Sequence, residues 1–128
     1  MANELILIVE DNDKNRKLAR DLLQFKGYRV AEAETAEAGL ALAAAQPPDL
    51  VLMDIHLPGM DGIEARKRLR ADPATSAIPV VAFTASVMPQ DRHQITAAGF
   101  DGFVSKPINI KEFLAAIEDK LAARGKAG

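Results

Sequence analysis

Residues 50–54 read LVLMD, four apolar residues followed directly by an acidic one. Residues 5–9 read LILIV, and Glu10 and Asp11 come next. Runs that are almost wholly aliphatic are typical of strands buried on both faces of a parallel sheet. The two stretches therefore predict inner strands that end in carboxylates.

Short apolar runs alternate along the whole chain with longer segments of helical period. This alternation is typical of an α/β domain, in which helices flank a parallel sheet, and not of a sandwich or a helical bundle. The expected strands are Leu5–Val9, Arg29–Ala33, Leu50–Met53, Val80–Thr84 and Phe103–Ser105. We expect them to form one open sheet.

The first helical segment follows the first strand. Residues 14–26 place Leu18, Leu22 and Phe25 on one side of a helix, which we expect to be its apolar side. Two further helices are predicted from the residues that cap their N-termini. Thr35 is a good N-cap for the segment 36–45.

The last helix has the clearest start. Asn109, with Glu112 three residues later, resembles a capping box. An apolar stripe follows it, as expected for a helix that packs on a sheet.

The composition is that of one folded domain. The chain has 128 residues, of which 48% are hydrophobic and 27% charged, a balance that supports a core. We expect a single domain over residues 1–128, with an ordered core over about 4–123 and a frayed tail over 124–128. Cysteine is absent, which excludes disulfides, thiolate catalysis and cysteine-based metal sites.

Charge and hydropathy favour a protein partner. The formal net charge is −2, with no basic footprint for nucleic acid or an anionic membrane. Arg66, Lys67, Arg68 and Arg70 form a basic run, which we interpret as an exposed helix face. The apolar run near the N-terminus is too short for a signal peptide or a membrane span, so we expect a cytoplasmic protein.

Polar residues close four of the expected strands. They are Glu10, Asp11, Asp54, Thr84 and Lys106. In an open parallel sheet, ligands gather beyond the carboxyl ends of the strands. Two carboxylates about 4 Å apart repel by about 4 kcal/mol at an effective dielectric of about 20, so three of them need a cation. A hard divalent ion, Mg²⁺ or Mn²⁺, suits such oxygen ligands.

A carboxylate near a metal and a cationic side chain can attack phosphorus and form an aspartyl phosphate. Asp54 is the best candidate nucleophile because it closes an aliphatic strand and precedes the turn at residues 57–59. Thr84 and Lys106 can each bind one oxygen of the phosphoryl group.

Four segments of the chain are similar to the signature segments of response-regulator receiver domains. They are Val9-Glu10-Asp11-Asn12, MDIHLPGMDG at residues 53–62, Phe83-Thr84-Ala85 and Ser105-Lys106-Pro107. The resemblance spans nearly the whole chain. It implies a flavodoxin-like, doubly wound fold with five parallel strands in the order 2-1-3-4-5 and helices on both faces.

The resemblance also implies site residues. Asp54 would accept a phosphoryl group from a histidine kinase or a histidine phosphotransfer protein. Asp11, Asp54 and the backbone carbonyl of His56 would bind Mg²⁺, and Glu10 would contribute through water.

Thr84 and Lys106 would sense the phosphoryl group, and Phe103 stands at the aromatic switch position. Phenylalanine lacks the hydroxyl of the tyrosine found in many members, so coupling would depend on ring packing. The Lys106-Pro107 peptide is expected to be cis.

The family pattern also implies partner surfaces. Helix four, strand five and helix five, about Pro89 to Ala123, would form the output face, and helix one would dock the phosphodonor. The motifs most resemble stand-alone receivers of the DivK cell-division type. Such a protein signals through a partner and is not a turnover enzyme.

Two alternatives belong to other classes. A small phosphatase of the haloacid dehalogenase type also forms an aspartyl phosphate, but it needs a second acid two residues after the nucleophile, where this chain has His56. A flavin or nucleotide binder needs a glycine-rich phosphate loop after the first strand. Asp11 and Asp13 would repel a phosphate there.

Overall fold

The computed structural model describes residues 3–57, 59–84, 89–106 and 108–127, with side chains except at 89–92 and 123–127. The strands are β1 (Leu5–Val9), β2 (Arg29–Ala33), β3 (Leu50–Asp54), β4 (Val80–Thr84) and β5 (Gly102–Ser105). The helices are α1 (Asp13–Phe25), α2 (Ala36–Ala45), α3 (Gly62–Ala71), α4 (Pro89–Ala97) and α5 (Ile110–Ala127). All five expected strands are present, and β3 and β5 are each one residue longer than expected.

The strands form one parallel sheet in the order β2-β1-β3-β4-β5, as the family resemblance implied. β1, β3 and β4 are buried along their whole length because they lie inside the sheet with helices on both faces. The sequence places polar residues at the ends of these strands, so the order of the strands decides which of them become neighbours.

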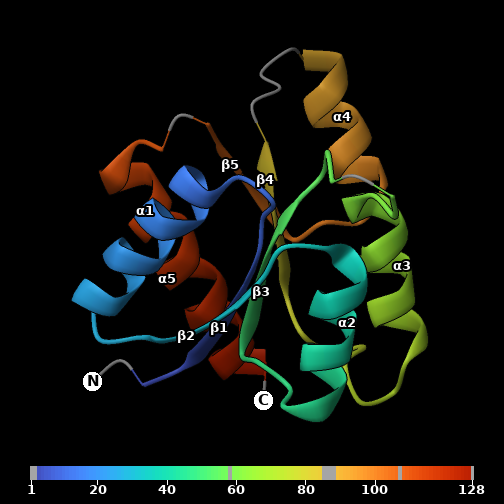
Figure 1. Cartoon of the computed structure of the whole chain (residues 1–128), viewed down its shortest axis with the longest axis horizontal. Helices are drawn as coiled ribbons and strands as arrows, with labels where there is room; N and C mark the ends of the chain where they lie inside the picture. The colour runs from blue at the N-terminus through green and yellow to red at the C-terminus, as the bar shows by residue number, and fades with distance from the viewer. Residues whose placement is uncertain (1–2, 58, 85–88, 107, 128) are drawn as a thin grey trace.

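Helices cover the sheet in two layers (Figure 1). α1 and α5 lie on one face, while α2, α3 and α4 lie on the other. Each face has its own core cluster. The cluster under α1 and α5 includes Ile8, Leu23, Phe83, Phe113 and Ile117. The cluster under α2, α3 and α4 includes Val9, Met53, Leu69, Ala82 and Ile95.

The expected apolar side of α1 is not the side that packs on the sheet. Ala19 and Leu23 are fully buried, whereas Leu18 is 41% exposed and Phe25 is 85% exposed. Neighbouring residues of a helix point about 100° apart, so the stripe one residue further along the helix faces the core. Of the predicted side, only Leu22 is partly buried against the core cluster, so the periodicity was right for a helix but the predicted face was wrong at Leu18 and Phe25.

The predicted caps are present. Thr35 Oγ1 accepts a hydrogen bond from the Ala38 amide at 3.1 Å, and Asn109 Oδ1 accepts one from the Glu112 amide at 3.1 Å. α5 continues to Ala127, beyond the expected end of the ordered core at residue 123, and the fraying of the tail stays a prediction. The expected cis peptide before Pro107 lies outside the described residues.

The basic run on α3 is only partly an exposed face. Lys67 and Arg68 are exposed, but Arg66 and Arg70 are half-buried. Arg70 Nη2 lies 3.0 Å from Asp101 Oδ2, so the Arg70 side chain turns toward the loop before β5. Within the described ranges, no helix combines the length and apolar character that crossing a membrane would require.

Candidate active site

Three carboxylates meet at the carboxyl ends of β1 and β3. Glu10, Asp11 and Asp54 each offer one oxygen, and these oxygens all lie within 4.8 Å of one another. β1 and β3 are neighbours in the sheet, with Val9 opposite Met53, so residues that follow the two strands must be close. Glu10 and Asp54 are buried and Asp11 is exposed, which leaves the cluster open on one side.

Lys106 brings a positive charge to this cluster from the end of β5. Its Nζ lies 2.5 Å from Glu10 Oε1 and 3.2 Å from Asp54 Oδ2. The Lys106 amide donates a hydrogen bond to the Thr84 carbonyl at 2.8 Å, which ties the end of β5 to the end of β4. The side chain therefore starts from a fixed point and reaches past β4 to the acids.

The Phe83 ring contacts the charged end of the Lys106 side chain. The Lys106 Nζ lies 4.7 Å from the centroid of the Phe83 ring, within the range of a cation–π contact. No role for Phe83 follows from the sequence alone. The available signals were its place in the Phe83-Thr84-Ala85 segment and its aromatic ring in an otherwise aliphatic strand.

Asp54 is held as a carboxylate. Burial alone favours its protonated form, but hydrogen bonds involving Glu10 and the His56 amide, together with Lys106, outweigh burial and lower the pKa of Asp54. The His56 amide donates to Oδ1 at 2.9 Å and Lys106 Nζ donates to Oδ2 at 3.2 Å. An ionised, oriented carboxylate of this kind can act as a nucleophile.

Glu10 has the opposite tendency. Burial, followed by its hydrogen bond with Asp54, raises the pKa of Glu10 to about 7 against the attraction of Lys106. The Asn12 amide donates to Glu10 Oε2 at 3.2 Å. Oε1 is buried and, within the described part of the chain, has the close ion pair with Lys106 but no hydrogen bond of ordinary geometry.

The donor set fits a hard divalent cation. When ionised, the three carboxylates carry −3 and Lys106 carries +1, so the cluster has a net charge of −2. All of its ligands are oxygens, and Glu10 Oε1 lacks a good hydrogen bond. Mg²⁺ prefers such ligands and would balance the charge.

The other expected residues surround the cluster. Thr84 is buried at the end of β4, beside β3. Phe103 is half-buried on β5 and packs against the core cluster on the α2, α3 and α4 side. His56 is exposed and its ring does not join the described acid cluster, while metal binding by its carbonyl stays a prediction.

Gly62 packs directly against the backbone of the site, at Asp54 and Ile55. A Cβ atom at this position would lie 2.5 Å from the Asp54 carbonyl oxygen and 2.8 Å from Ile55 Cα. The Gly62 amide donates to the Ile55 carbonyl at 3.0 Å. Its place at the end of the MDIHLPGMDG segment, close after Asp54, was the available sequence signal.

The chain is similar to known receiver domains over nearly its whole length. The family model for the response regulator receiver domain matches residues 6–118. The polar-differentiation response regulator DivK of Brucella ovis is 40% identical over 116 residues, which is 91% of this chain and 94% of DivK.

Solved structures agree with this match. The crystal structure of a CheY-like receiver domain protein from Methanospirillum hungatei JF-1 has a TM-score of 0.89 and 30% identity, covering 99% of this chain and 100% of that chain. The receiver domain of a sensor histidine kinase from Pseudomonas aeruginosa PAO1 has a TM-score of 0.86 and 30% identity, covering 94% and 99%. That crystal structure has a magnesium ion coordinated in the active site cleft.

The fold, the strand-end residues and the comparisons point to one family. The haloacid dehalogenase alternative gains no support from them. The strand order is that of CheY-like receivers. The chain belongs to the response regulator receiver domain family of two-component signalling.

Proposed function

We propose that Asp54 accepts a phosphoryl group from a phosphohistidine on a histidine kinase or a histidine phosphotransfer protein. The observation that carries this proposal is the convergence of Glu10, Asp11, Asp54 and Lys106 at the carboxyl end of the sheet. A receiver domain implies such a donor and a downstream target. The chain thus acts as a phosphoacceptor in signalling and not as a turnover enzyme.

The transfer is a displacement at phosphorus. An Asp54 carboxylate oxygen forms the new P–O bond, the P–N bond of the phosphohistidine breaks, and the electron pair stays on the imidazole nitrogen. Mg²⁺, when bound, neutralises charge on the oxygens of the phosphoryl group. Asp11, Asp54 and the His56 carbonyl would hold the ion directly, and Glu10 would hold it through water.

Lys106 and Thr84 detect the product. Lys106 Nζ is already 3.2 Å from Asp54 Oδ2, so it can pair with a phosphoryl oxygen attached there. The Thr84 hydroxyl donates to another oxygen, and the Phe103 ring adjusts to the position of Thr84. The changed surface of α4, β5 and α5 then binds the downstream protein in the cytoplasm, and α1 docks the phosphodonor.

The acceptor is tested by intact-mass analysis after incubation with Mg²⁺ and acetyl phosphate. We expect the wild-type chain to gain one phosphoryl group, Asp54→Asn to gain none, and Asp21→Asn, an exposed carboxylate on α1, to behave like the wild type. A phosphorylated Asp54→Asn variant would refute the assignment. Continuous phosphate release from unrelated phosphoesters would favour a phosphatase.

The role of Thr84 is tested separately. Thr84→Ala should leave Mg²⁺ affinity nearly unchanged but weaken the dependence of partner binding on phosphorylation. Phospho-dependent binding that equals that of the wild type would remove Thr84 from the switch.

A further inference from the structure

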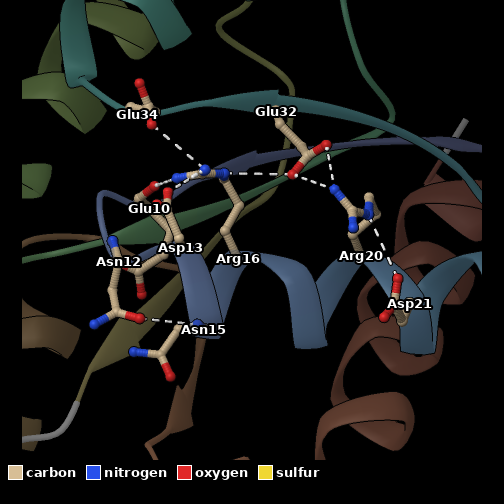
Figure 2. Close-up of polar contacts among 9 residues, drawn as sticks. All are labelled: Glu10, Asn12, Asp13, Asn15, Arg16, Arg20, Asp21, Glu32 and Glu34. Atoms are coloured by element: carbon tan, nitrogen blue, oxygen red, sulfur yellow. Dashed lines mark hydrogen bonds and ion pairs between the residues drawn. The ribbon is translucent and has the colours of Figure 1, made fainter.

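Arg16 contacts Glu10 of the acid cluster and joins three parts of the chain (Figure 2). Its side chain is only 15% exposed. Nη1 donates to the Glu10 carbonyl at 2.9 Å, Nε lies 3.4 Å from Glu32 Oε1, and Nη2 lies 3.4 Å from Glu34 Oε1. Nη2 also pairs with Asp13 at 2.5 Å. The guanidinium therefore connects the end of β1 with α1 and with the segment at the end of β2.

The backbone of Glu10 is held from both sides through these contacts. Its amide donates to the Ala33 carbonyl at 3.0 Å, and its carbonyl accepts from Arg16 at 2.9 Å. The peptide that contains this carbonyl also contains the Asp11 amide, and a peptide group is planar. Fixing the Glu10 carbonyl therefore fixes the direction in which the chain enters Asp11.

We infer that Arg16 is a positioning residue for Mg²⁺ binding, because it holds the Glu10–Asp11 peptide in the orientation that directs both carboxylates at one cation. This inference rests on the proposed function. Arg16 itself carries a positive charge and is not a metal ligand. Its effect passes through the backbone of the two acids that precede α1.

Positioning and simple electrostatics predict opposite effects of removing Arg16. A positive charge near a cation site repels the cation, so loss of the charge alone would tighten Mg²⁺ binding. Loss of a group that orients the ligands would weaken it. Partners that orient metal ligands typically contribute about 10–100-fold in affinity.

Lysine does not replace arginine in this place. Arg16 uses Nε, Nη1 and Nη2 on different partners, which requires the planar fork of a guanidinium. An ammonium group keeps the charge but is a single point on a flexible stem. Arg16→Lys therefore separates geometry from charge.

Arg20 offers a matched control. It lies one turn further along α1 and pairs with Glu32 at 3.2 Å and with Asp21 at 3.5 Å. Its charge and its partners resemble those of Arg16. Within the described residues, it makes no hydrogen bond to the backbone of Glu10 or Asp11.

The experiment measures Mg²⁺ affinity by calorimetric titration of the full chain with MgCl₂. We expect Arg16→Lys and Arg16→Gln to bind Mg²⁺ about tenfold more weakly than the wild type, and Arg20→Gln to bind it as well or slightly better. Amide NMR signals of Asp11 and Asn12 should shift in both Arg16 variants without Mg²⁺. Urea unfolding in EDTA shows whether each variant is folded. If Arg16→Gln is not folded, the Mg²⁺ affinity of Arg16→Lys, which keeps the charge, decides the test.

Wild-type affinity in Arg16→Lys, tighter binding in Arg16→Gln, or equal losses in Arg16→Gln and Arg20→Gln would each overturn the inference. The wild-type chain is measured first. If it neither binds Mg²⁺ nor gains a phosphoryl group, the proposed function fails. If it does both and the Arg16 variants match it, only the role of Arg16 fails.

Discussion

Glu10 is a buried carboxyl group whose preferred protonation state changes on folding. Its pKa rises from 4.5 to about 7, mainly because burial disfavours the charge. Between these two pH values the folded chain binds more protons at Glu10 than the unfolded chain does. In EDTA, the free energy of unfolding should therefore fall as the pH rises from about 5 to about 7. Urea midpoints at several pH values measure this slope.

Glu10→Gln supplies the control, because an amide does not titrate. The slope between pH 5 and pH 7 should be much smaller in this variant. The lowered pKa of Asp54 acts in a different range, since its stabilising contribution is lost only as the pH falls below the ordinary range of an aspartate. Equal slopes in the two proteins would show that Glu10 is not the responsible group.

Gly62 leaves space that no other residue would leave. A Cβ there would meet backbone atoms of Asp54 and Ile55, which cannot rotate away. Gly62→Ala should lower the free energy of unfolding by about 1–3 kcal/mol and slow the phosphorylation of Asp54. Chemical unfolding and intact-mass time courses measure the two effects.

Gly102→Ala is the comparison for this change. A Cβ at Gly102 would meet Lys120 Cε at 2.9 Å, but Lys120 is a long side chain that can move. We expect a loss below about 1 kcal/mol there and an unchanged rate of phosphorylation. A Gly62→Ala variant as stable as Gly102→Ala would contradict the close backbone approach.

At the scale of the elements, α1 has two apolar stripes with different fates. Leu23 is fully buried against the sheet, whereas Phe25 is 85% exposed. Leu23→Ala should destabilise the fold by about 2–5 kcal/mol, and Phe25→Ala should change stability by less than about 0.5 kcal/mol. Urea unfolding of the two variants distinguishes them, and a large loss for Phe25→Ala would mean that the helix is rotated.

The same helix shows where prediction from sequence stops. The inner strands were predicted almost to the residue, because a strand such as β3 is apolar along its length and ends in a charge. For α1, both Leu22 and Leu23 offer an apolar stripe, and periodicity does not say which one meets the sheet. Tertiary packing decided it, and left Leu18 and Phe25 on the outside.

The site residues also fall into two groups, those that could be predicted from the sequence and those that could not. The convergence of Glu10, Asp11, Asp54 and Lys106 was predictable because these residues end or directly follow strands, and strand ends of a parallel sheet meet at one edge. The residues that contact and orient these four side chains could not be predicted. The sequence gives no spacing rule that puts Phe83 under Lys106 or Arg16 on a backbone carbonyl, because these contacts join side chains to distant or irregular segments.

At the scale of the whole molecule, strand order turns separate strand ends into one site. β1 and β3 are adjacent, so their acids crowd together, while β5 lies on the far side of β4. Lys106 crosses that distance to pair with Glu10 and Asp54. The fold thus places one long cationic side chain where two buried carboxylates would otherwise repel.

Removing this lysine should reveal how far the fold depends on it. In EDTA, Lys106→Met leaves Glu10 and Asp54 buried without their cation, and breaking such a pair costs about 3–5 kcal/mol. We expect about 3 kcal/mol, because Glu10 can take up a proton instead. Mg²⁺ should restore more stability to this variant than it adds to the wild type, since it supplies the missing charge. Urea unfolding with EDTA or MgCl₂ tests both points, with the exposed Lys67→Met as control, and a Lys106→Met variant as stable as the wild type in EDTA would refute the dependence.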